Sequence, residues 1–152
     1  MSIWKFFHIV SMFAAVSLFV GTSVLFGRLV GTRDVVAIRR FEGVAVPVVR
    51  VAIGLVLLGL VFGLITVNDE NFSYTQGWLI AAYLIFGALF ALGPFEGRWQ
   101  ARIFAAAKAS PDDAPSPELE AMIANTGRRA VVLTSMVLYV AIIYDMVMKP
   151  FS

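Results

Sequence analysis

The chain has 152 residues, of which 60% are hydrophobic and only 14% are charged, and its formal net charge is +2. The length fits one domain, and so few charges indicate a membrane protein, because about a quarter of the residues of a soluble domain are charged. The small net charge gives nucleic-acid binding no electrostatic basis, and the absence of cysteine excludes disulfides, thiol redox chemistry and cysteine-ligated metals.

The first apolar stretch, about residues 4–27, reads WKFFHIVSMFAAVSLFVGTSVLFG. It is longer than the apolar core of a signal peptide, and no small-residue cleavage site closes it. We therefore interpret it as a retained first transmembrane helix, for which about 20 apolar residues are needed. Lys5 and His8, the only histidine of the chain, lie at its start, and Arg28 follows its end.

Three further apolar stretches, at about 44–66, 76–97 and 129–149, are also long enough to span a membrane. None of them shows the alternation of polar and apolar residues that is typical of barrel strands. The sequence thus predicts an all-α, polytopic membrane protein. We expect residues 1–152 to form a single domain, a four-transmembrane-helix bundle with short amphipathic cytoplasmic segments.

The second span contains a GxxxG pattern, formed by Gly59 and Gly63. Small residues of this kind let helix backbones approach closely in lipid. The pattern fits two alternatives, packing between helices of one chain or a face for dimerisation.

The stretch between the third and fourth spans begins with RWQARIFAAAKAS, which predicts a basic helix near the membrane surface. We expect Ile103 and Phe104 to lie in the membrane interface there. Ser116 followed by Pro117 is typical of a helix start. The fourth helix is therefore expected to begin near Pro117 and to loosen around residues 125–127.

Lysine and arginine are concentrated in the first and third connections, whereas the second connection, VNDENFSYTQ, has neither. Basic loops of membrane proteins face the cytoplasm. We therefore expect a multi-pass protein of the cell inner (plasma) membrane with both termini outside the cytoplasm. The basic residues concerned are Arg28, Arg33, Arg39, Arg40, Arg98, Arg102, Lys108, Arg128 and Arg129, and the tryptophans at predicted span ends, expected at the headgroups, are Trp4, Trp78 and Trp99.

Lys5, His8 and Asp145 form a candidate polar cluster on the outer side. His8 lies about four residues inside the first span and Asp145 about four inside the fourth, roughly 6 Å below the boundary at 1.5 Å per residue. If those two helices are neighbours, the carboxylate would hold the imidazole in one tautomer. Alternatively, Lys5 extends to the headgroups and His8 is satisfied by water or lipid.

Arg28, Arg50 and Glu96 form a second candidate polar cluster, on the cytoplasmic side. Arg50 lies about six residues inside the second span, and a carboxylate partner, Glu96 or Glu42, would lower the cost of burying it. A paired structural arginine, an arginine that extends to the interface and an arginine that binds a substrate or headgroup stay open as alternatives.

The chain lacks the residues that most cofactor sites require. With one histidine it has no evident metal site and no pair of histidines for a b-type haem. A single haem held by His8 and an axial methionine, among Met12, Met146 and Met148, stays open. We identify no catalytic residues, because no nucleotide-binding loop or zinc-protease motif is present, and we favour a protein that is not an enzyme.

The opening stretch, with Lys5, His8, Arg28 and Leu29, resembles that of an uncharacterised family of small bacterial four-helix integral membrane proteins. It is more distantly similar to HemJ-type protoporphyrinogen oxidases and to CopD-type copper-resistance membrane domains. The resemblance to HemJ-type proteins implies that His8 is a candidate haem ligand. The chain departs from these two groups in having no lysine in the third span and only one histidine.

Three functions follow as hypotheses. The first is an accessory, assembly or orphan protein of the bilayer, which meets a membrane-protein partner or forms a homo-oligomer and binds no nucleic acid. The second is a redox or porphyrin-handling membrane protein that binds haem through His8. The third is a small dimeric transporter.

Overall fold

The computed structural model describes residues 2–150, and these residues form five helices and no strands. Four of the helices are long and apolar enough to cross a membrane, which confirms the all-α class and the predicted spans. The helices are α1 (Ile3–Thr32), α2 (Val35–Asp69), α3 (Gly77–Ala109), the short α4 (Pro117–Ala124) and α5 (Thr126–Met148).

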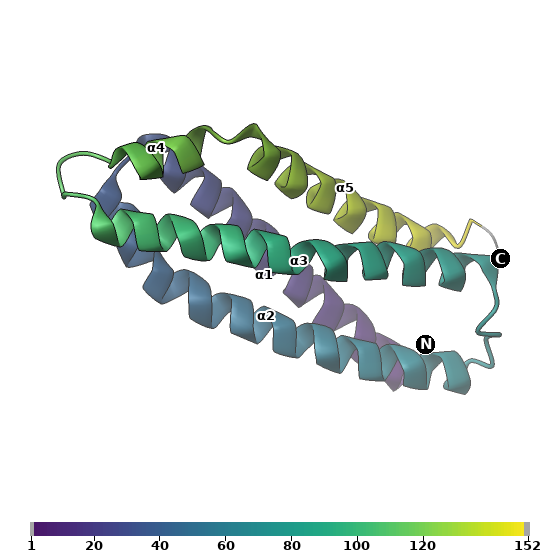
Figure 1. Cartoon of the computed structure of the whole chain (residues 1–152). Helices are drawn as coiled ribbons and strands as arrows, with labels where there is room; N and C mark the ends of the chain where they lie inside the picture. Colours follow the sequence, from purple (N-terminus) through teal and green to yellow (C-terminus); the bar gives the residue numbers. More distant parts are fainter. Residues whose placement is uncertain (1, 151–152) are drawn as a thin grey trace.

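The long helices are arranged as two antiparallel pairs (Figure 1). α1 packs along α2, which is the most extensive pairing, and α3 packs along α5. Contacts between the pairs are fewer, and α1 meets α5 at only a few positions. The described chain begins and ends at one end of the bundle, and α4 lies at the other end (Figure 1).

The turn between α1 and α2 is much tighter than expected. Residues 28–43 were predicted to form a connecting loop, but α1 continues to Thr32 and α2 begins at Val35. Arg33 ends α1 in the left-handed conformation, with φ of 60°. The Asp34 carboxylate accepts a hydrogen bond from the backbone N–H of Ala37 at 2.9 Å and so caps the start of α2. The expectation of a loop was wrong because this local capping lets both helices run on to the turn.

α1, α2 and α3 are longer than a bilayer requires. At 1.5 Å per residue, the 35 residues of α2 extend about 52 Å, against about 30 Å for the hydrocarbon core. The excess length packs together at the end where α4 lies. We call this assembly the head, defined by its buried apolar residues Phe26, Val30, Val35, Ile38, Ala45, Ile103, Phe104, Ala106, Ala107, Leu119 and Ile123.

The head corrects the expectation of a surface helix between the third and fourth spans. Residues 98–109 continue α3, and Ile103 and Phe104 are buried in the head instead of lying in the membrane interface. Trp99 packs against the same core. The physical reason is that α1, α2 and α4 offer these apolar side chains a protein environment.

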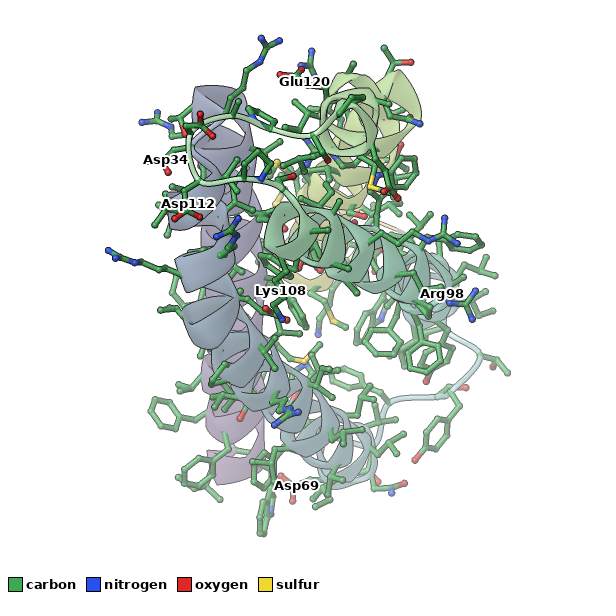
Figure 2. All side chains as sticks on the ribbon, turned by 60° about the vertical axis from the view of Figure 1, so that its left-hand side comes forward. Asp34, Asp69, Arg98, Lys108, Asp112 and Glu120 are labelled. Atoms are coloured by element: carbon green, nitrogen blue, oxygen red, sulfur yellow. The ribbon has the colours of Figure 1, made fainter. Side chains whose placement is uncertain are left out.

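Charged residues tie the head together across long sequence separations. Arg39 donates from Nε to the carbonyl oxygen of Ala107 at 2.6 Å, from Nη1 to Asp112 Oδ1 at 2.5 Å, and from Nη2 to the carbonyl oxygen of Ser110. Lys108 pairs with Glu42 at 2.5 Å. Figure 2 shows Lys108 and Asp112 at the head, together with Asp34 and Glu120, and Asp69 at the opposite end of the molecule.

The junction between α4 and α5 follows the expectation from the sequence. Ser116 Oγ accepts a hydrogen bond from the backbone N–H of Leu119 at 3.2 Å, so Ser116 caps α4 as predicted. α4 ends at Ala124, and the Asn125 side chain accepts a hydrogen bond from the backbone N–H of Gly127 at 2.8 Å as α5 begins. The predicted helix start and the predicted break are both confirmed.

Candidate functional site

Lys5 is paired with a residue that lies outside the two predicted polar clusters. Its Nζ donates to both carboxylate oxygens of Glu70, at 3.1 and 2.8 Å, and both side chains are half-buried. Glu70 follows the last residue of α2, so this ion pair joins the start of α1 to the end of α2. The only sequence signal for it was the acidic character of the second connection.

His8 lies against the GxxxG pattern of α2. Its Nδ1 is 2.7 Å from the carbonyl oxygen of Gly59, and a Cβ atom at Gly63 would lie only 2.9 Å from the same nitrogen. Since a carbonyl oxygen only accepts, Nδ1 carries the proton, and in the neutral ring Nε2 is the acceptor. Gly59 also makes room for Met12, whose Sδ would be 2.5 Å from an added Cβ. The pattern therefore serves packing between two helices of one chain.

Asp145 is not joined to either of its predicted neighbours. Its side chain is buried in α5, and among residues 2–150 its Oδ2 has no hydrogen-bond partner. Lys149, one turn later, places Nζ over the rings of Phe72 and Trp78, 4.1 and 4.7 Å from their centroids. Trp78 itself is buried. No hydrogen bond or ion pair between described residues links Lys5, His8 and Asp145.

The structure also leaves the members of the second predicted cluster apart. Arg28 and Arg50 are both exposed, and neither forms an ion pair within residues 2–150. Glu96 is half-buried and accepts a hydrogen bond from Ser135 Oγ, which joins α3 to α5. Glu42, the other proposed partner of Arg50, is paired with Lys108.

Arg128, which belongs to neither predicted polar cluster, lies partly buried against an aromatic ring. Its guanidinium lies over the ring of Phe26, 5.9 Å from the centroid, and its Nε is buried without a hydrogen-bond partner in the described chain. Together with Arg129 it lines an open cavity of about 330 Å³ between α1 and α5. The sequence analysis used these two arginines only to predict the orientation of the chain in the membrane. The cavity could not be predicted, because its other wall is formed by α1, which is distant in the sequence.

The residues around His8 do not fit a haem with a methionine as its second ligand. The two axial ligands of a haem iron approach from opposite faces of the ring, whereas Met12 follows His8 by one turn and both side chains lie against α2. Met146 packs with the cluster of Val67 and Trp78, and Met148 is exposed. In residues 2–150, no three residues among histidine, aspartate and glutamate come close enough to hold a metal ion.

Comparison with known proteins identifies one family. The family model described as "Predicted integral membrane protein (DUF2269)" matches residues 2–150. No curated protein and no solved structure matches the chain. The match confirms the expected resemblance to an uncharacterised family of integral membrane proteins. It does not extend to the HemJ-type and CopD-type proteins.

Proposed function

The chain belongs to the DUF2269 family of predicted integral membrane proteins, and we propose that it is a non-catalytic accessory protein of the bilayer, which acts by binding another membrane protein or a second copy of itself. The observation that carries this proposal is the use of polar side chains inside the long helices. Lys5 and His8 each join α1 to α2, and Glu96 joins α3 to α5. Polar groups used in this way hold helices together in lipid. Because they are engaged inside the bundle, we expect the protein to act through the outer surfaces of its helices.

The surface best suited to a partner helix is the outer face of α5. Five of its apolar side chains recur at spacings of four and three residues, which places them on one face of the helix. Each of them is 58–72% exposed, because α5 packs mainly on α3 and touches α1 at few positions. These side chains, which we call the α5 face, are Leu133, Val137, Val140, Tyr144 and Val147.

Site-specific photo-crosslinking in intact membranes tests the proposal. A photoreactive amino acid at Val140 is expected to yield a discrete adduct, because a bound helix would lie against it. The matched control is Leu57, an apolar residue of α2 that is 59% exposed and lies outside the α5 face. An adduct of twice the chain's mass would identify a second copy as the partner. Absence of a discrete adduct at Val140, or an equal adduct at Leu57, would contradict an accessory role through the α5 face.

The haem hypothesis is separated from this proposal by the visible absorption spectrum. Protein purified in detergent from haem-replete cells is expected to be colourless, because the groups around His8 pack two helices against each other. A Soret band that is present in the unchanged protein and absent from His8→Ala would replace the accessory role with haem binding.

We also propose that the head faces the cytoplasm. Nine of the twelve lysine and arginine residues lie at the head or at the helix ends beside it, and Lys5, Arg50 and Lys149 are the others. Basic segments next to spans are retained on the cytoplasmic side. The inner (plasma) membrane of a bacterial cell is the membrane that this orientation fits.

A further inference from the structure

The cavity between α1 and α5 combines a cationic wall with an apolar one. Arg128 and Arg129 lie on its α5 side, and Ser23 lies on its α1 side. Glycine widens the α1 wall, because a Cβ atom added at Gly27 or Gly31 would meet nothing within 4 Å. The remaining surface is apolar and is contributed by Val30, Ile123, Val132 and Leu133.

The arginines of this cavity have no anionic partner in the described chain. The four ion pairs among residues 2–150 involve Lys5, Arg33, Arg39 and Lys108. Glu96 lines a narrower hollow together with Arg128, but it is hydrogen-bonded to Ser135. The Nε of Arg128 is buried without an acceptor among the described residues, and its guanidinium has no carboxylate partner there, which is costly unless an anion enters the cavity.

The position of the cavity indicates where that acceptor comes from. Arg128 and Arg129 are in the first turn of α5, where the span meets the head. If the head lies at the cytoplasmic surface of the membrane, as proposed above, the phosphates of membrane lipids are expected at this level. Basic pockets between transmembrane helices on that side bind anionic headgroups. The Gly127 amide, in the first turn of α5, is already satisfied by the Asn125 side chain, and the donors that line the cavity are the guanidinium groups of Arg128 and Arg129.

We propose that this cavity binds the phosphate group of an anionic phospholipid, such as phosphatidylglycerol. The two guanidinium groups hold the phosphate, and Ser23 donates to a headgroup oxygen. The apolar wall contacts the upper part of the acyl chains. Two positive charges facing one phosphodiester favour a lipid with net negative charge over a zwitterionic one. This site shares only Leu133 with the α5 face.

Native mass spectrometry of detergent-purified protein titrated with phosphatidylglycerol or phosphatidylcholine tests the site. The unchanged protein is expected to retain phosphatidylglycerol with at least tenfold preference. The double variant Arg128→Ala/Arg129→Ala is expected to lose on the order of tenfold or more in affinity, because each basic residue near the surface contributes about 1 kcal/mol. The control, Arg98→Ala/Arg102→Ala, removes the same charge from exposed positions of α3 and should keep the preference.

A second variant keeps the proposal testable if the arginine double variant does not fold. Gly27→Leu fills the open wall of the cavity and leaves both arginines in place, so it should also abolish the preference for phosphatidylglycerol. Equal loss in the two arginine double variants would show non-specific charge attraction and overturn the proposal. Saturation by glycerol phosphate, with no preference between the two lipids, would overturn the lipid assignment in favour of a soluble phosphate compound.

Discussion

Gly63 leaves the space that the imidazole of His8 occupies, and this pair shows how single residues bring α1 and α2 together. A Cβ atom added at Gly63 would lie 2.9 Å from Nδ1 and 3.0 Å from Cε1 of His8. The ring cannot move away freely, because Nδ1 is hydrogen-bonded to the carbonyl oxygen of Gly59. The close approach of the two helices therefore depends on a glycine and a histidine at matching heights.

Gly63→Ala is expected to destabilise the protein by about 1–2 kcal/mol, because the added methyl group overpacks against the His8 ring. Thermal unfolding in detergent measures this change. The matched control is Gly54→Ala, where an added Cβ meets nothing within 4 Å, and its melting temperature should stay the same or rise slightly.

The same substitution is expected to become nearly harmless once the imidazole is gone. In a His8→Ala background, Gly63→Ala should lower the melting temperature little or not at all, because the atoms that clash are absent. If the two changes were simply additive, the crowding of His8 against Gly63 would not be the cause of the destabilisation.

At the scale of elements, the end of α3 is held by a residue of α2. Arg39 binds the carbonyl oxygens of Ala107 and Ser110 and the carboxylate of Asp112. The last carbonyls of a helix lack intrahelical partners, and a guanidinium at this position takes that role by donating hydrogen bonds to them. Its positive charge also interacts favourably with the negative end of the helix dipole. One side chain thus fixes α3 and the loop after it to α2.

Arg39→Ala is expected to cost on the order of 2 kcal/mol, since hydrogen bonds that involve a charged group are removed together. Limited proteolysis near residues 110–116, together with thermal unfolding, measures the loss. Arg39→Lys should rescue little of it, because an ammonium group does not reproduce the fork of the guanidinium. Arg40→Ala, at an exposed neighbouring position, should behave like the unchanged protein, and an equal effect of both alanine variants would contradict the role of Arg39.

The sequence predicts the membrane-spanning elements better than it predicts the head. Apolar runs of sufficient length identify the four spans, and Ser116 and Asn125 mark the ends of α4 because capping is local. The head is built from Ile38, Ile103 and other apolar residues that lie within basic stretches. Those stretches looked like connections, and only long-range contacts such as Arg39 with Asp112, 73 residues apart, assemble them.

The candidate polar clusters could be predicted only in part, for a related reason. The sequence identified Lys5, His8, Glu96 and Asp145 as polar residues in apolar surroundings, but it did not identify their partners. His8 binds a backbone carbonyl, which carries no sequence signature, and Lys5 binds Glu70 rather than a residue of α5. Matched depth in the membrane does not fix which helices are neighbours.

At the scale of the whole molecule, the two helix pairs place the α2–α3 loop and the head at opposite ends (Figure 1). Because the chain has no cysteine, single cysteines can report on each end without background. We expect Ser73→Cys to react with a membrane-impermeant thiol reagent from outside the cell, and Asp113→Cys to react only after the membrane has been permeabilised. Both positions are exposed. Labelling of Asp113→Cys from outside would contradict the proposed orientation of the head.

The accessory role rests on the use of polar residues in the spans to hold helices together. Thermal unfolding of purified His8→Ala most directly tests that use. We predict that His8→Ala melts at a clearly lower temperature, because it loses the hydrogen bond to Gly59 and leaves the space beside Gly63 unfilled, at a combined cost of about 1–3 kcal/mol. A melting temperature equal to that of the unchanged protein would contradict this claim, because His8 would then not stabilise the packing of α1 on α2.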